Sequence, residues 1–180
     1  MTVHIKLEPF TAADIDQLIA WIPSEKFLLQ WAGPGLSFPL NRGELERELV
    51  KVPQENLVHL IYKAVDSSTG ETVGHGQLLG IDRQNRSATA GRILVGSPEL
   101  RGQGVGEQIV RALLRIAFQE LSLHRVVLRV LDFNKAAVRC YEKVGFRQEG
   151  LIRDIYKVGD QYWSLRQMSI LEDEWPKESP

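Results

Sequence analysis

Residues 101–106, Arg-Gly-Gln-Gly-Val-Gly, place a glycine at every second position directly before an amphipathic run that is typical of a helix. Glycine is less favourable than alanine by roughly 0.5–1 kcal/mol inside a helix or strand, so this spacing needs a physical reason. A glycine-rich turn leading into a helix exposes unpaired N–H groups beside the positive end of the helix dipole. The pattern therefore predicts a site for a phosphate or pyrophosphate, with a merely flexible turn as the alternative.

The residues expected to hold this anion are Arg101, Gly102, Gln103, Gly104, Val105 and Gly106. The arginine can add a charge-assisted hydrogen bond, and the glutamine and valine matter mainly through their backbone amides. Two well-known phosphate loops do not fit, because a dinucleotide fingerprint needs a glycine where Glu107 stands and a Walker loop needs Gly-Lys followed by Ser or Thr. We therefore expect some other phosphate compound.

A second candidate pair, Asn134 and Tyr141, stands seven residues apart in a stretch predicted to be helical. Seven residues leave two helical side chains only about 20° out of alignment and about 10.5 Å apart along the axis, so both lie on one face. An amide can bind a polar chain there, and a phenol can supply a proton. The alternative is structural: Asn134 is an N-cap and Tyr141 is core, because Ala137, Val138 and Tyr141 also form a packing stripe.

Hydrophobic periodicity predicts the elements that must position these residues. Strands are expected at 3–7, 56–66, 71–82, 87–95 and 124–132 and in a hairpin over 146–171, and helices at 11–22, 41–52, 104–121 and 134–144, with a short helix after Ser24 that breaks at Gly33-Pro34-Gly35 into a loop suited to be a substrate wall. The strand, helix, strand run over 87–132 implies a parallel strand pair. We expect an α/β (α+β) fold with a mixed, mostly antiparallel sheet flanked by helices.

Composition limits the kinds of partner. The 180-residue chain has a formal net charge of −1, which argues against a nucleic-acid surface and against a basic membrane face. We expect one domain over residues 1–180 and a small-molecule partner. Cys140 is the only cysteine, no apolar run approaches the ~20 residues of a membrane span, and no signal-peptide core follows Met1. These features favour a cytoplasmic protein.

The motifs resemble those of the GNAT acyltransferase superfamily. "RGQGVG" matches the pattern R/Q-x-x-G-x-G/A, the strand "RILVGSPEL" precedes it as in that family, and "NKAAVRCYEKVGF" is similar to a second signature. The resemblance extends from about Ile81 to Met168, and "ILEDEW" is similar to the branch with ribosomal-protein N-terminal acetyltransferases. It implies a GNAT-like fold and acetyl-CoA as co-substrate.

The resemblance also implies roles for single residues. The pyrophosphate of coenzyme A would lie on the amides of 101–106, and the pantetheine arm would run along the strand like an extra strand, beside Ile93, Leu94 and Val95.

On the following helix the resemblance assigns Asn134, with Ala137 beside it, to the pantetheine arm. It makes Tyr141 the general acid that returns a proton to the leaving thiolate. A phenol of ordinary pKa near 10 holds that proton at neutral pH.

The base that would deprotonate the amine is not evident from the sequence. Strand "RILV" carries no acid, so we consider His75 on the neighbouring strand, which could titrate near neutrality. The alternative is a structural histidine. Glu25 is a rival for binding a cationic amine, with a solvated helix residue as its alternative. Ser164 stands where several relatives have Asp, which weakens any transfer of their acceptor contacts.

Other reactive side chains suggest no further chemistry. Cys140 lies about 100° around the helix from Tyr141 with no histidine nearby in sequence, so we expect a buried structural thiol. His4, His59 and His124 are scattered without carboxylates at ligand spacing, so we expect no metal.

Five aromatic residues fall on the segments expected to flank the acceptor: Trp31, Phe38, Tyr156, Tyr162 and Trp163. They could form an apolar or cation-binding wall, or the contact of a homodimer.

Together these features predict an N-acetyltransferase that moves the acetyl group of acetyl-CoA directly to a primary amine, either a protein N-terminus or a small amine. The alternatives are an acetyltransferase of a polyamine or aminoglycoside, and a non-catalytic acyl-CoA-binding sensor.

Overall fold

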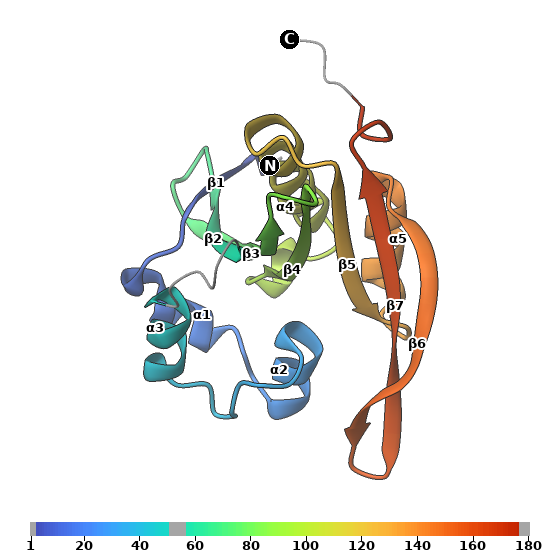
Figure 1. Ribbon diagram of the computed structural model, residues 1–180. Coiled ribbons are helices and arrows are strands. Elements are labelled where there is room, and N and C mark those ends of the chain that lie inside the picture. The colour runs from blue at the N-terminus through green and yellow to red at the C-terminus, as the bar shows by residue number, and fades with distance from the viewer. Residues whose placement is uncertain (1–2, 51–56, 177–180) are drawn as a thin grey trace.

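A seven-stranded sheet forms the centre of the molecule, in the order β1-β2-β3-β4-β5-β7-β6 (Figure 1). The computed structural model describes residues 3–50 and 57–176. Neighbouring strands are antiparallel except for the parallel pair β4 and β5. The strands are β1 (Ile5–Pro9), β2 (Leu57–Asp66), β3 (Thr72–Asp82), β4 (Ser87–Val95), β5 (Arg125–Leu131), β6 (Arg147–Val158) and β7 (Gln161–Leu171). The expected fold class and the expected parallel pair are confirmed.

Helices cover both faces of this sheet. They are α1 (Ile15–Ala20), α2 (Glu25–Ala32), α3 (Arg42–Val50), α4 (Val105–Arg115) and α5 (Lys135–Val144), and a π-helical stretch, Ile116–Glu120, continues α4. Gly74 and Gly76 of β3 face α4, whereas His75 between them contacts Phe10 and Trp31 on the other face. The predicted end of the third helix before Pro53 lies outside the described residues.

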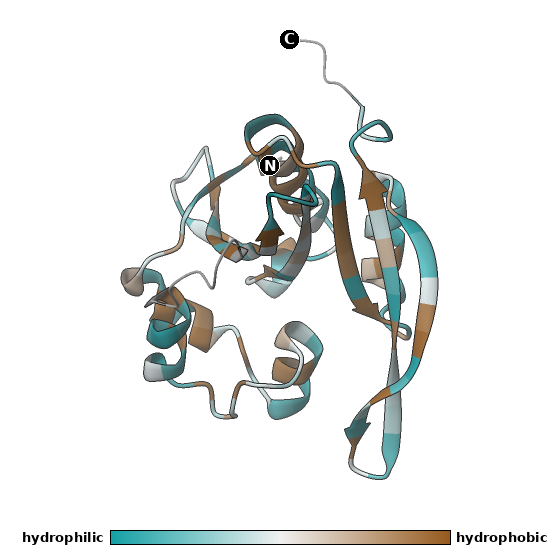
Figure 2. Ribbon diagram, viewed as in Figure 1, coloured by the Kyte–Doolittle hydropathy of each residue, from teal (hydrophilic) through white to brown (hydrophobic). Residues whose placement is uncertain are grey.

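Helix α4 is anchored tightly, and it carries the glycine loop at its N-terminus. Its residues Ile109, Val110, Leu113 and Leu114 are 0% exposed. A Cβ atom added at Gly74 would lie 2.7 Å from Ile109 Cδ1 and 2.6 Å from the Leu94 carbonyl oxygen, so only glycine lets helix and sheet approach this closely. The apolar character of the central strands is visible in Figure 2, where β5 is mostly brown. The loop therefore stands on a rigid base.

Strands β4 and β5 separate after a short paired region. Their register joins Ser87, Ala88 and Thr89 of β4 to 125–127 of β5 and stops there, although both strands continue. On its other side, β4 carries a bulge where the pairing with β3 passes from Leu94 to Gly91, and Arg92 within it has φ +49°. A bulge bends its strand and increases the twist. The sheet therefore opens at this point.

Candidate active site

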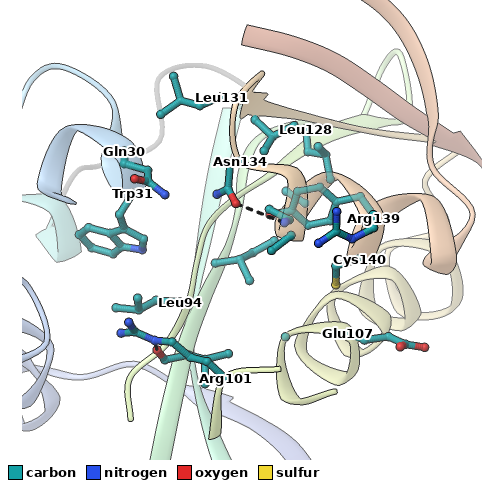
Figure 3. A pocket seen from close by; sticks show the side chains of 18 of the residues that line it. Gln30, Trp31, Leu94, Arg101, Glu107, Leu128, Leu131, Asn134, Arg139 and Cys140 are labelled. Atoms are coloured by element: carbon teal, nitrogen blue, oxygen red, sulfur yellow. Dashed lines mark hydrogen bonds between the residues drawn. The ribbon is translucent and has the colours of Figure 1, made fainter. Parts of the chain in front are cut away.

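A pocket of about 560 Å³ lies where β4 and β5 separate, which is within the size range of small-molecule sites (Figure 3). The glycine loop borders one end, helix α2 borders the other, and α5 forms a side wall. Most residues predicted for the site line this pocket: Ile93, Leu94, Val95, Arg101, Gly102, Gly104, Gly106, Asn134, Ala137 and Tyr141. Predicted residues between 93 and 141 thus line one cavity.

The glycine loop presents its backbone to the pocket. Gly102 has φ +76° and Gly104, the N-cap of α4, has φ +82°, which is left-handed backbone that glycine adopts without strain. A Cβ at either position would meet no heavy atom of the described chain within 4 Å. Conformation and free space, not crowding by the protein itself, therefore explain these two glycines.

Most amides of the loop are available to a ligand. The amide of Arg101 already donates to the Pro98 carbonyl at 3.1 Å, so the cradle of amides begins at Gly102 rather than at Arg101. Within the described chain, the amides of 102–106 have no recorded backbone acceptor, as expected for a loop and the first turn of a helix. The side chain of Gln103 is exposed and that of Val105 is buried, and neither lines the pocket. Their amides remain the predicted contacts.

Cationic side chains gather at the loop end. Arg101 lines the pocket, although its guanidinium donates to the Val95 carbonyl at 3.1 Å. Arg139 and Lys143 of α5 line the same end, and Lys143 Nζ lies 2.6 Å from Glu107 Oε2. That hydrogen bond lowers the pKa of Glu107 and keeps it a carboxylate. The positive charge around the loop favours an anionic ligand.

The open edge of β4 supplies the second part of the site. Beyond Thr89, β4 has no paired residue on β5, and Ile93, Leu94 and Val95 line the gap. The Arg92 carbonyl at the bulge accepts a hydrogen bond from Trp31 Nε1 at 2.9 Å. An unpaired strand edge is a template for an extended ligand. The splay that a pantetheine arm needs is present.

Asn134, directly before α5, and Tyr141, within α5, each make a structural contact and also border the pocket. Asn134 Oδ1 accepts from the Ala137 amide at 3.3 Å, which makes Asn134 the N-cap of α5, and its remaining amide group borders the pocket (Figure 3). Tyr141 packs edge-on against Phe146, with ring centres 6.0 Å apart, and also lines the pocket. Burial raises the pKa of the Tyr141 phenol above its usual value, so it keeps its proton. The functional and the structural interpretations of this pair are therefore compatible, because each side chain makes a capping or packing contact and also borders the pocket.

His75 lies away from the pocket. It is 1% exposed and is covered by the rings of Phe10 and Trp31, at 4.9 and 5.7 Å between centres. Burial, reinforced by the charge of Arg92, lowers its pKa to about 3. Its Nε2 lies 2.9 Å from Gln77 Nε2. This position argues against the role of base and for a structural histidine.

Cys140 is half-buried and lines the pocket, which differs from the expected fully buried thiol. Burial, with the nearby Glu107 carboxylate, raises the pKa of its thiol. A thiol kept protonated is a poor nucleophile, so its surroundings oppose an acyl-enzyme role.

Besides Arg139 of α5, two arginines of the pocket, Arg92 and Arg129, were not predicted from the sequence. Both stand in strands, and nothing in a strand pattern reveals where two neighbouring strands separate. The pocket also includes Phe27 and Gln30 of α2, the helix that opens the segment expected to be a substrate wall. The expected aromatic wall is only partly formed, because Trp31 lines the pocket whereas Phe38 and Tyr162 are exposed to solvent.

No group of three or more His, Cys, Asp or Glu side chains in 3–50 and 57–176 is arranged to hold a metal ion. Within the same residues, no helix is both long and apolar enough to cross a membrane.

The chain is similar to several known proteins over part of its length. The chain is 29% identical over 111 residues to the spermidine N(1)-acetyltransferase of Vibrio cholerae, covering 62% of this chain and 63% of the relative. It is 32% identical over 109 residues to YdaF of Bacillus subtilis, which is named provisionally as a ribosomal N-acetyltransferase, covering 61% and 58%. The chain thus spans about three fifths of the length of each.

Solved structures share the whole fold. The spermidine N-acetyltransferase of Vibrio cholerae, in complex with CoA and spermine, superposes with a TM-score of 0.81 at 24% identity, covering 95% of this chain and 97% of the other. The family model for the acetyltransferase (GNAT) domain matches residues 4–147, which is most of the chain. The resemblance found in the sequence is confirmed, and the chain belongs to the GNAT acetyltransferase family.

Proposed function

We propose that the protein transfers the acetyl group of acetyl-CoA to a primary amine. One observation carries the proposal: a loop of unpaired amides, an unpaired strand edge and a protonated tyrosine all border the same pocket. Each part matches one portion of the co-substrate, namely its diphosphate, its pantetheine arm and its sulfur. The family match and the names of the relatives support the same reaction.

The residues of the pocket fit coenzyme A. The amides of 102–106 would bind the diphosphate, with Arg139 and Lys143 supplying positive charge beside it. The free edge of β4 at 93–95 would pair with the amides of the pantetheine arm, and Asn134 would bind it from the opposite wall. The open space at the two left-handed glycines leaves room for the phosphates.

Acetyl-CoA supplies a thioester whose carbonyl carbon the amine nitrogen attacks, so that a C–N bond forms, the C–S bond breaks and the sulfur leaves as a thiolate. Tyr141 donates a hydrogen bond to that sulfur as it gains charge and then delivers the proton. Its raised pKa keeps the phenol protonated throughout the neutral range. The chain therefore stabilises the leaving group at the point where negative charge develops.

Deprotonation of the amine falls to solvent. Among the described residues that line the pocket, the single carboxylate is Glu107, which lies at the loop end and is tied to Lys143 and Arg111. His75 is outside the pocket. We therefore assign the proton to water at the α2 end, where the amine enters.

Replacing Tyr141 by phenylalanine tests the proposal. We expect Y141F to lower kcat by roughly a hundredfold or more, the usual contribution of a positioned acid, with the affinity for acetyl-CoA nearly unchanged. Release of free thiol with a panel of amines measures the rate, and calorimetry measures binding. Y62F, which removes a phenol of β2 outside the pocket, is the matched control. Tight binding of acetyl-CoA by the wild type without thiol release on any amine would instead establish a sensor.

A further inference from the structure

The end of the pocket near α2 is positively charged. We call it the acceptor end and define it by Gln30, Trp31, Arg92 and Arg129. Two of these four residues are arginines, and no carboxylate of the described lining residues lies here, because Glu107 belongs to the opposite end. Because Arg92 is paired with Glu48 of α3, the positive charge that an entering amine would meet here is that of Arg129.

Both arginines lie on the face of the sheet that α2 covers. The guanidinium of Arg92 lies 6.0 Å from the centre of the Trp31 ring, and its Nη1 pairs with Glu48 of α3 at 2.9 Å. On β5, Arg129 alternates with the core residues Leu128 and Val130, so it faces the same side as Leu131, which packs against Leu29 of α2.

Arg129 keeps donors for a ligand. Its Nε donates to Gln167 Oε1 at 3.3 Å, and the side chain is exposed. A guanidinium carries five N–H donors, so this contact uses one of them. The geometry leaves the two terminal nitrogens of Arg129 for a carboxylate or similar anion.

Three aromatic rings on or beside α2 already hold cations of the chain itself. Lys26 Nζ lies 5.5 Å from the centre of Trp163, Arg92 sits over Trp31, and the Arg101 guanidinium lies 5.7 Å from the centre of Phe27. Glu48, the carboxylate that meets Arg92, is occupied by that ion pair at 2.9 Å. A polyamine would therefore meet the positive charge of Arg129, and none of the described residues that define the acceptor end carries a carboxylate.

From this arrangement we propose that the acceptor is a primary amine with a carboxylate a few bonds away, as in an α-amino acid or a peptide N-terminus followed by an acidic residue. Arg129 binds the anionic group and directs the amine toward the thioester. Polyamines are disfavoured, in contrast to the acceptors in the names of several relatives. The inference rests on the proposed acetyl transfer.

The test compares acceptors that differ only in the anionic group. L-Leucine is paired with L-leucinamide, and a tetrapeptide beginning Ser-Glu is paired with one beginning Ser-Gln; spermidine is the polycationic arm. We expect kcat/KM from thiol release to be at least about fivefold higher for one acidic member than for its neutral partner. Leucinamide has the more weakly basic amine and more free base at neutral pH, so a preference for leucine cannot come from intrinsic reactivity.

The outcomes distinguish a failure of this inference from a failure of the proposed acetyl transfer. Preference within the leucine pair identifies a free amino acid, and preference within the peptide pair identifies a protein N-terminus. Turnover of spermidine or of the neutral members as fast as the acidic ones would overturn the inference and leave acetyl transfer intact. If no amine of the panel led to release of thiol from acetyl-CoA, both the proposed acetyl transfer and this inference would fail.

Variants of Arg129 assign the effect to that side chain. We expect R129Q to abolish most of the preference for the acidic acceptor by raising its KM, and R129K to restore part of it, with the KM for acetyl-CoA unchanged. R83Q, which removes an exposed arginine of the β3–β4 turn, is the matched control. Added NaCl should lower kcat/KM for the acidic acceptor in the wild type but not in R129Q, because salt screens the attraction. An undiminished preference in R129Q would contradict the role of Arg129.

Discussion

Tyr141 and His75 show how burial decides the chemical role of a titratable side chain. Tyr141 and His75 both titrate, and burial stabilises the neutral form of each. For Tyr141 the neutral form carries the proton that the sulfur needs. For His75 the neutral form lies behind Phe10 and Trp31, outside the pocket, so it contributes packing.

The buried histidine should leave a signature in stability. Its folded pKa is about 3, whereas an unfolded histidine titrates near 6.5, so the unfolded chain binds an extra proton between these values. Stability contributed by neutral His75 is therefore present above about pH 6.5 and is lost as the pH falls toward 3, with a slope approaching about 1.4 kcal/mol per pH unit.

Urea unfolding of wild type and H75Q between about pH 4.5 and 7 measures this slope. We expect the free energy of unfolding of the wild type to fall more steeply on acidification than that of H75Q, whatever the offset between the two proteins at neutral pH. Parallel curves would show that His75 has nearly the same pKa in the folded and the unfolded protein, so that its surroundings are more polar than the structure indicates.

At the scale of elements, the contact between α4 and β3 keeps the glycine loop in place. G74A would introduce a Cβ at 2.6 Å from the Leu94 carbonyl oxygen and 2.7 Å from Ile109 Cδ1, and one of these must move. We expect a loss of about 1–3 kcal/mol in the free energy of unfolding, the usual effect of overpacking a core.

Denaturant unfolding with G43A as control checks this prediction. Gly43 lies in α3, and an added Cβ would meet only Asn41 Oδ1 at 3.5 Å, so alanine should leave stability equal or slightly higher. Equal stabilities of G74A and wild type would mean that α4 can shift on the sheet, and the loop would not be held as rigidly as we infer.

Elements with a strong local signal were predictable. The three glycines before an amphipathic run predicted the loop and α4, and Asn134 with Gly145 marked the two ends of α5. The separation of β4 and β5 was not predictable, since it depends on pairing between distant strands. The bulge was hidden as well, because its left-handed residue is Arg92 rather than the glycine that usually signals such a backbone. The acceptor end, which depends on both features, was therefore missed.

At the scale of the molecule, a net charge near zero conceals a charged pocket. The chain carries a formal charge of −1, yet the described residues that line the pocket include five arginine or lysine side chains and a single carboxylate: Arg92, Arg101, Arg129, Arg139 and Lys143 against Glu107. Such focusing raises the local concentration of anionic ligands. The overall charge argues against nucleic acid as a partner, but it could not reveal this polarity.

Location and assembly remain predictions at this scale. We expect a cytoplasmic protein from its single cysteine. A homodimer contact would use the exposed apolar residues of the β6–β7 hairpin, Leu151, Ile155 and Tyr162, rather than the buried Trp163.

The proposed function depends most on binding of a diphosphate by the glycine loop, and one pair of variants measures this binding. G104N and G104D place side chains of nearly equal shape at φ +82°, a conformation that Asn and Asp tolerate better than most residues. Calorimetry with coenzyme A should show affinity at least about tenfold weaker for G104D than for G104N, because the carboxylate faces the phosphates. Equal affinities in two folded variants would contradict the diphosphate site and with it the proposed orientation of the thioester.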